Sequence, residues 1–216
     1  MSSYLEKFLY AWKKPYIRDT DLYTLFLVDN TRRYDSIKYA IRTDVLQPIR
    51  RGVYLIHLPH RRLEYDPFEL AQVIYGPSYI SLESALSFHG WIPEAVYTTT
   101  SVATRRSKTF DTPIGLFHYA HVPTTGFYQH VKRIELKNSA FFMAEPWKAI
   151  ADHLYVHKKK WLSISDLDLD LRIEIETLQQ SDLNVLAELS KYYHHLKTRR
   201  TLRRFLQELE HGIKSY

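Results

Sequence analysis

Cysteine is absent from this 216-residue chain, and glycine and proline are scarce, with 6 and 9 residues. The absence of cysteine excludes a disulfide framework and a thiolate metal site and is typical of a reducing compartment, so we expect a cytoplasmic protein. A composition of 45% hydrophobic and 25% charged residues excludes low-complexity and disordered classes. Glu6, Lys7, Lys13 and Lys14 leave no apolar core for a signal peptide, and no run of about 18 apolar residues is present to span a membrane. We therefore expect a globular protein without a membrane partner.

Positive charge is concentrated in the first third of the chain. Residues 1–63 hold 12 Lys and Arg against 6 Asp and Glu, a balance of 12 − 6 = +6, which equals the net charge of the whole chain. This asymmetry indicates two domains, 1–63 and 64–216, of which the first meets a polyanion such as nucleic acid. The alternative is a basic but merely solvated surface.

The first domain has the pattern of a winged helix-turn-helix. Apolar residues at helical spacing predict a helix that Pro15 ends, a second helix that begins after Asp19 or Asp21, and a third over residues 32–43, preceded by a turn at residues 28–31. The segment LQPIRRGVYLI, residues 46–56, predicts a hairpin around Gly52 that would form the wing.

The polar face of the third helix and the tip of the hairpin supply candidate DNA contacts. Arginines in a recognition helix can bind guanine edges, whereas wing arginines more often contact phosphates. Winged helices that bind a protein partner instead of DNA have the same pattern, so that alternative stays open. The candidate DNA-binding residues are Arg32, Arg33, Ser36, Lys38, Tyr39, Arg42, Arg50 and Arg51.

The stretch GPSYISLESALSFHGWIPE, residues 76–94, concentrates polar residues but does not predict an active site. Its apolar spacing predicts a short helix capped by Ser81 and ended by a left-handed Gly90, with Glu83 in the first turn. A nucleophile elbow would need a second glycine after the serine, which Gly76-Pro77-Ser78-Tyr79-Ile80 lacks. We assign no catalytic residue and expect no enzyme.

The second domain is expected to be α+β. A helix through Leu70 and Ile74 precedes β-branched or aromatic runs at 96–103, 114–122, 131–136 and 139–144, and helices follow at 145–157, 181–191 and 197–211. In the first of these C-terminal helices, the simplest interpretation makes Glu145, Lys148 and Asp152 surface residues.

Histidine spacing does not predict a metal site. His118 and His121 lie three apart on an expected strand and so face opposite sides, whereas His153 and His157 share a helix face but lack the glutamate of a zincin motif. No glycine-rich phosphate loop occurs, so no cofactor is expected. The basic runs at 158–160 and 199–204 are interpreted as solvated surface, with a phosphate, DNA or acidic-protein contact as the alternative.

Three segments carry a resemblance to a known family. GPSYISLESALSFHGWIPE, VYTTTSVATRRSKTFDTPIGLFHYAHV and AEPWKAIADHLY, together with the basic segment that ends in Arg51-Gly52-Val53-Tyr54, resemble the AbiEi-type antitoxin and transcriptional regulator family from about Asp21 to Tyr155. The tail from about Lys158 has no counterpart in this resemblance.

The resemblance implies a function in two parts. The N-terminal domain would repress its own operon by binding double-stranded DNA at its promoter, where inverted repeats are expected. The C-terminal domain would neutralise a nucleotidyltransferase-like toxin of a type IV toxin–antitoxin, or abortive-infection, system. The alternative is a stand-alone winged-helix transcriptional regulator without a cognate toxin.

Overall fold

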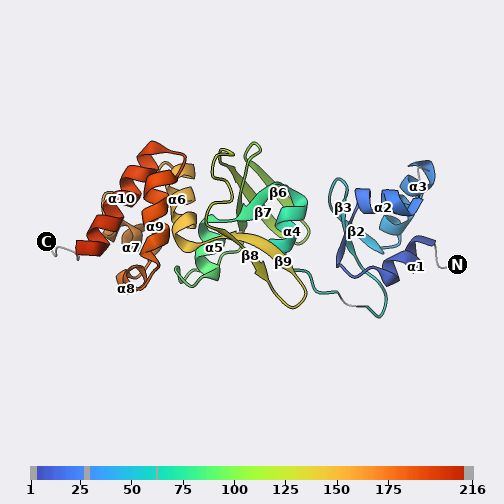
Figure 1. Ribbon diagram of the computed structural model, residues 1–216. Helices are drawn as coiled ribbons and strands as arrows, with labels where there is room; N and C mark the ends of the chain where they lie inside the picture. Colours follow the sequence, from blue (N-terminus) through green and yellow to red (C-terminus); the bar gives the residue numbers. More distant parts are fainter. Residues whose placement is uncertain (1–3, 27–29, 62, 212–216) are drawn as a thin grey trace. The chain divides into compact units, whose positions relative to one another are not determined.

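A computed structural model describes residues 4–26, 30–61 and 63–211, and the chain divides into two compact units (Figure 1). Unit 1 comprises Met1–Ile74 and Thr112–Ile114, and unit 2 comprises Tyr75–Asp111 and Gly115–Tyr216. Both units combine helices and strands, which confirms the expected mixed α+β class. In the described part of the chain, no helix has the length and apolar character needed to cross a membrane.

Unit 1 contains three helices and a small antiparallel sheet before its last helix. The order is α1 (Tyr4–Ala11), β1 (Tyr16–Arg18), α2 (Asp19–Phe26), α3 (Asn30–Arg42), β2 (Leu46–Arg50), β3 (Val53–Ile56) and α4 (Pro67–Ile74). The sheet order is β1-β3-β2. Gly52 has φ +78°, which lets the chain reverse between β2 and β3 as the hairpin requires. The turn expected before the third helix includes Val28 and Asp29, which lie outside the described residues.

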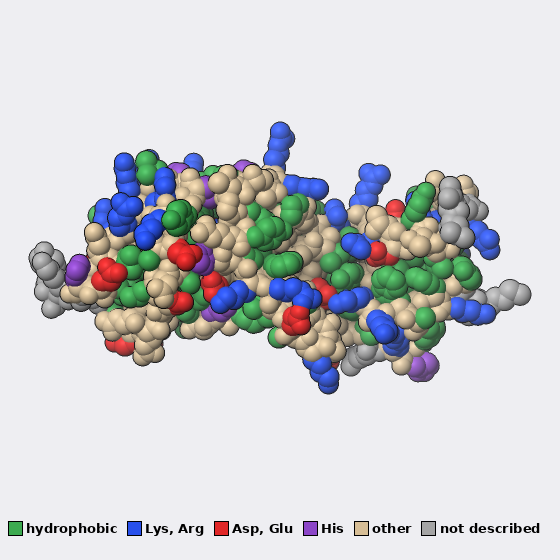
Figure 2. Space-filling model, viewed as in Figure 1, with side chains coloured by type: hydrophobic (Ala, Val, Ile, Leu, Met, Phe, Trp, Pro, Cys, Tyr) green, Lys and Arg blue, Asp and Glu red, His purple; other side chains and the backbone are tan. Residues whose placement is uncertain are grey.

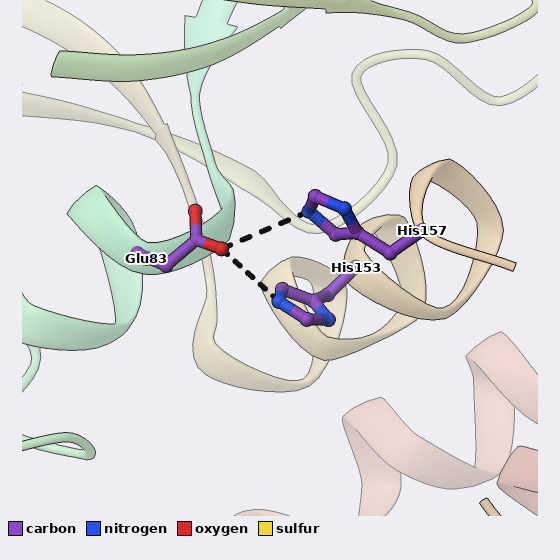
Figure 3. A group of neighbouring side chains, drawn as sticks. All are labelled: Glu83, His153 and His157. Atoms are coloured by element: carbon purple, nitrogen blue, oxygen red, sulfur yellow. Dashed lines mark hydrogen bonds and ion pairs between the residues drawn. The ribbon is translucent and has the colours of Figure 1, made fainter. Parts of the chain in front are cut away.

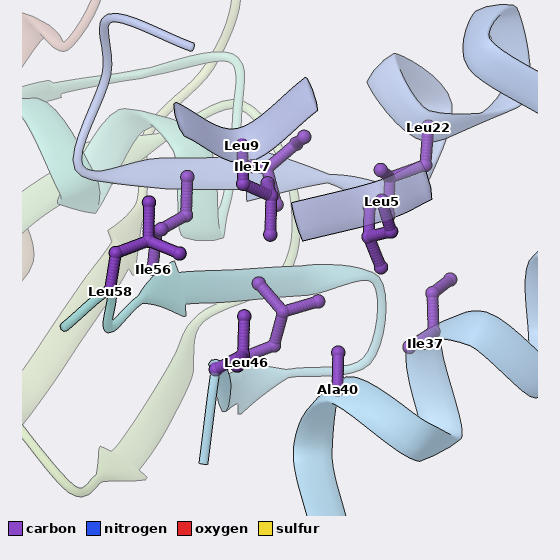
Figure 4. Close-up of a cluster of buried hydrophobic side chains, with 10 residues drawn as sticks. Leu5, Leu9, Ile17, Leu22, Ile37, Ala40, Leu46, Ile56 and Leu58 are labelled. Atoms are coloured by element: carbon purple, nitrogen blue, oxygen red, sulfur yellow. The ribbon is translucent and has the colours of Figure 1, made fainter. Parts of the chain in front are cut away.

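The apolar stripes of the helices meet the sheet in one core (Figure 4). Leu5 and Leu9 of α1, Leu22 of α2 and Ile37 of α3 are buried at 6% exposure or less, so each helix presents one apolar stripe to the sheet. β1, which the sequence did not predict, contributes Ile17 and pairs with β3. The buried cluster consists of Leu5, Leu9, Ile17, Leu22, Ile37, Ala40, Val45, Leu46, Ile56 and Leu58.

Unit 2 is built on a six-stranded mixed sheet of order β6-β7-β5-β4-β9-β8. Its strands are β4 (Ser78–Ile80), β5 (Thr99–Ala103), β6 (Lys108–Thr112), β7 (Gly115–His121), β8 (Val131–Glu135) and β9 (Ala140–Ala144). β4 pairs antiparallel with β5 and parallel with β9, and β8 and β9 form the antiparallel pair that Asn138 predicted. Two strands, β4 and β6, were not predicted.

Helices flank this sheet and gather in the C-terminal part of unit 2 (Figure 1). They are α5 (Leu82–Phe88), α6 (Pro146–Val156), α7 (Ser165–Leu171), α8 (Ile175–Gln179), α9 (Leu183–Tyr192) and α10 (Leu196–His211). α6 packs against α5 and α9, and α9 packs against α10. α5 and α6 thus face each other, which brings residues near position 81 close to residues near position 152.

Candidate functional site

The exposed side of α3 is the candidate nucleic-acid interface in unit 1. Lys38, Tyr39 and Arg42 are exposed on α3, and Arg51 is exposed in the turn between β2 and β3. The Arg42 guanidinium lies over the Tyr39 ring, 5.3 Å from its centroid, so this arginine is partly preorganised on the helix surface. On the face shown in Figure 2, Lys and Arg side chains also project from unit 2, so positive charge is not confined to the basic first third.

Three other predicted contact residues are less exposed. Ser36 is half-buried, and the Arg50 Nε is buried without a hydrogen-bond partner among the described residues. Arg33 lies on the same side of α3 as the buried residues Ile37 and Ala40. The expectation that Arg33 lies on the outer face is therefore wrong.

The Arg33 side chain, 18% exposed, lies 3.4 Å from the Asp19 carboxylate and 5.1 Å from the Tyr23 ring centroid. This arginine therefore joins α3 to α2. Arg32, by contrast, is exposed on α3.

Several basic residues of the first third serve the fold. The Arg61 guanidinium donates to the carbonyl oxygens of Leu9, Tyr10 and Trp12 at 2.6 to 2.9 Å, and so caps the C-terminal end of α1. Arg18 donates two bonds to the Asp21 carboxylate. The excess of +6 is thus only partly available to a partner.

A buried polar network joins β4, α5, α6 and α9 in unit 2. Asp152 is fully buried, at 0% exposure, and accepts hydrogen bonds from Tyr79, Ser81, Tyr193 and Lys148, each at 2.8 or 2.9 Å. The expectation that Lys148 and Asp152 are surface residues is therefore wrong. That expectation assigned only the apolar residues of α6 to the core, but a buried ion pair with satisfied hydrogen bonds can also occupy core positions.

The network also explains the serine of the first motif. Ser81 stands at the N-cap position of α5 but makes no side-chain capping bond, because its hydroxyl donates to Asp152. Burial and the Asp152 charge raise the pKa values of the Tyr79 and Tyr193 hydroxyls well above their ordinary value, so both stay protonated donors. Gly90 does have the expected left-handed φ, +71°.

Next to this network, Glu83 lies close to His153 of α6 and to His157, the C-cap residue of α6 (Figure 3). Oε1 of Glu83 lies 3.1 Å from Nε2 of His153 and 3.7 Å from Nε2 of His157. One ligand atom from each of the three side chains lies within 4.8 Å of the others. The sequence signal for the pair was the i, i+4 spacing of the histidines, whereas the carboxylate comes from 70 residues earlier and carried no local signal.

Burial and charge shift the pKa values of Glu83 and His157. Burial raises the pKa of the Glu83 carboxyl, but the hydrogen bond from His153 and the histidine charges outweigh burial and leave that pKa below its ordinary value. Burial and the neighbouring His153 lower the pKa of His157. These shifts favour an ionised Glu83 carboxylate and a neutral His157 imidazole, and metal ions bind such deprotonated side chains.

A cavity of about 620 Å³ lies elsewhere in unit 2, and it has the size of a small-molecule site. Lys158, Lys160, Lys197 and His121 line it together with hydroxyl groups, and none of the described lining residues carries a carboxylate. Its chemistry suits an anion. The basic run at 158–160, interpreted from the sequence as a solvated loop, thus forms part of a cavity wall.

Comparison with known proteins gives no family: no protein-family model matches this chain, and no curated protein matches it either.

Proposed function

We propose that this protein is a DNA-binding antitoxin of the AbiEi type that represses its own operon and neutralises a nucleotidyltransferase-like toxin. In this proposal unit 1 is a winged helix-turn-helix whose third helix, α3, enters the major groove of promoter DNA. The wing is the β2–β3 hairpin, which carries Arg51. No enzymatic reaction is required of either unit.

The observation that carries the DNA-binding part is the placement of cations in unit 1. The order helix, strand, helix, helix, strand, strand, with the sheet order β1-β3-β2, is compatible with a winged helix. Lys38 and Arg42 are exposed on the face of α3 opposite Ile37, and Arg51 is exposed in the turn that follows β2. A duplex offers both base edges and phosphates to such a pair of elements.

The antitoxin part is supported by the resemblance of unit 2 to the AbiEi-type family. Two segments that carry it, residues 76–94 and 144–155, form β4 with α5 and α6, which pack together around Asp152. Their polar residues therefore belong to one structural unit, as expected if the resemblance reflects a shared domain.

DNA binding is tested by fluorescence anisotropy with a duplex from the chain's own upstream region and a scrambled duplex, over a range of salt concentrations. Arg42→Ala should weaken operator binding by about 1 to 3 kcal/mol if this arginine reads a base. Arg51→Ala should weaken both duplexes alike and reduce the salt slope by about 1. The control is Lys137→Ala, which changes an exposed lysine of unit 2. Operator binding that neither arginine variant alters would refute the winged-helix assignment.

Neutralisation is tested by growth of cells that express the neighbouring open reading frame alone, with the full-length chain, or with its Arg42→Ala/Arg51→Ala variant. Rescue by both proteins, with repression lost only in the variant, is the expected result. A harmless neighbour, or toxicity that neither protein relieves, would contradict the antitoxin assignment.

A second candidate is a stand-alone transcriptional regulator whose unit 2 binds an effector. The cavity lined by Lys158, Lys160 and Lys197 favours it, because an anionic small molecule fits its charge and volume. Two results together would favour this candidate over the antitoxin. The operator affinity of the protein would change when phosphorylated metabolites are added, and expression of the neighbouring open reading frame alone would not slow cell growth.

A further inference from the structure

We propose that Glu83, His153 and His157 form a binding site for one divalent transition-metal ion of the Zn²⁺ class. Neither DNA binding nor toxin neutralisation requires such a site, so it goes beyond the proposed function. The site lies within unit 2, between the first turn of α5 and the C-terminal part of α6 (Figure 3).

The spacing of the ligand atoms is close to what the ion requires. With metal–ligand distances of about 2.0 to 2.1 Å, tetrahedral geometry places neighbouring ligand atoms about 3.3 Å apart. The two distances from Glu83 Oε1 to the Nε2 atoms of His153 and His157 are 3.1 and 3.7 Å. One ligand atom from each side chain lies within 4.8 Å of the others, so the side chains must rotate to bring the whole set to the tetrahedral spacing.

The ligands stand on elements that hold their positions. His153 is in the last turn of α6 and His157, four residues later, is the C-cap residue of this helix, so their rings lie on one face, with centroids 4.3 Å apart. The Trp161 ring stacks on His153 at 5.4 Å with an interplanar angle of 8°, which fixes the ring orientation of the most buried ligand. These restraints reduce the conformational entropy that binding an ion would remove.

The donor set selects the class of ion. Two imidazole nitrogens and one carboxylate oxygen suit Zn²⁺, Co²⁺, Ni²⁺ or Cu²⁺, whereas Mg²⁺ and Ca²⁺ prefer oxygen ligands alone. Three protein ligands leave a fourth position for water. The side chains of Glu83 and His157 are 32% and 40% exposed, against 4% for His153, so an ion can enter from solvent.

One missing hydrogen bond limits the affinity of this site for a metal ion. Nδ1 of His153 is buried and has no hydrogen-bond partner in the described part of the chain, although histidine ligands usually donate their second N–H to an acceptor. Loss of such a partner typically weakens binding by about 10- to 100-fold, so we expect weaker affinity than in a fully supported zinc site.

The test uses the untagged full-length chain after treatment with EDTA. Zn²⁺ is titrated by calorimetry, and Co²⁺ by its visible absorption, which reports tetrahedral coordination directly. Glu83→Gln and His157→Ala change the two more exposed ligands and so spare the core, and circular dichroism checks that both variants fold. His211→Ala is the matched control, because it changes an exposed histidine on α10.

We expect one equivalent of Zn²⁺ per chain, a tetrahedral Co²⁺ spectrum, and a Tm that rises with Zn²⁺. Glu83→Gln and His157→Ala should each weaken binding by at least about tenfold and abolish the tetrahedral spectrum, while His211→Ala matches the unaltered chain. Binding that is equally tight in the two folded ligand variants, or no saturable binding by the unaltered chain, would overturn the proposal. Neither result depends on DNA or toxin binding, so this site and the proposed function can fail separately.

Discussion

Removal of the Lys148 charge is expected to destabilise unit 2 strongly. Lys148 is 2% exposed, and its ammonium donates to the fully buried Asp152 carboxylate at 2.8 Å. In Lys148→Met the carboxylate would keep its three hydroxyl donors but lose its only counter-charge among the described partners. Breaking a buried ion pair from one side costs about 3 to 5 kcal/mol. At about 2 to 4 °C per kcal/mol for a chain of this size, Tm should fall by about 6 to 20 °C.

The complementary variant, Asp152→Asn, removes the negative charge of the pair and completes a double-mutant cycle with Lys148→Met. It keeps an oxygen that accepts from Tyr79 and Ser81, but among the described residues it leaves the Lys148 ammonium only the faces of two tyrosine rings, 4.8 and 5.5 Å away. Cation–π attraction of about 0.5 to 2 kcal/mol does not replace the carboxylate. The double variant has no unpaired charge, so it should be more stable than the sum of the two single losses predicts, by at least about 2 kcal/mol.

Urea denaturation followed by far-UV circular dichroism gives the free energies of unfolding for this cycle. Lys137→Met, at an exposed position of unit 2, is the matched control and should change stability by no more than about 0.5 kcal/mol. A loss below about 1 kcal/mol for Lys148→Met, or additive single losses, would show that the buried pair does not hold these elements together.

Three further predictions concern stability and pH. Arg61→Lys should lower the free energy of unfolding of unit 1 by about 1 to 3 kcal/mol, measured by urea denaturation, because one ammonium nitrogen cannot replace the two guanidinium nitrogens that bond the carbonyl oxygens of Leu9, Tyr10 and Trp12. Arg33→Gln should also destabilise unit 1, through loss of the Asp19 contact, yet leave the salt slope of DNA binding within about 0.5 of its original value, in contrast to Arg51→Ala. Burial, and then the Lys148 charge, lower the pKa of His194 to about 4. In the unfolded chain His194 takes up a proton near pH 6.5, whereas in the folded protein it stays neutral until the pH approaches 4. The free energy of unfolding is therefore highest above pH 6.5 and decreases as the pH falls towards 4. His194→Gln should flatten the stability profile in that window, by about 1 to 2 kcal/mol after allowance for solvent screening, in urea titrations at stepped pH.

The sequence predicted elements with strong periodicity and missed those without it. α3, α6 and α10 lie within one or two residues of their predicted ranges, because each has a continuous apolar stripe. β1 and β4 have three residues each, too few for an alternating pattern to develop, and they depend on pairing with β3 and β5. Short helices such as α8, with five residues, form through tertiary packing that no local pattern encodes.

The candidate site was less predictable because its partners are distant in the chain. The spacing of His153 and His157 was visible, but Glu83 joins them only because α5 packs against α6. Arg33 shows the converse error, because an arginine in a basic helix was assigned to the outer face although its contact with Asp19 draws it towards α2. Charge type alone does not distinguish a cation that binds a partner from one that binds the fold.

The same distinction applies to the segments that carry the family resemblance. Ser81 is bonded to Asp152, the His89 Nε2 lies 3.0 Å from the Ala144 carbonyl oxygen, and the Trp147 Nε1 donates to Ser181, so much of their polar character is used inside unit 2. Substitution of these groups would disturb folding before it tested recognition, because each loss leaves a buried or partly buried partner without its hydrogen bond. Residues that contact a toxin, or that admit an ion from solvent to a site, must keep polar atoms accessible. Of the polar groups beside this network, Glu83 and His157 meet that condition, which makes their variants a sharper test of function than any change at Ser81 or Asp152.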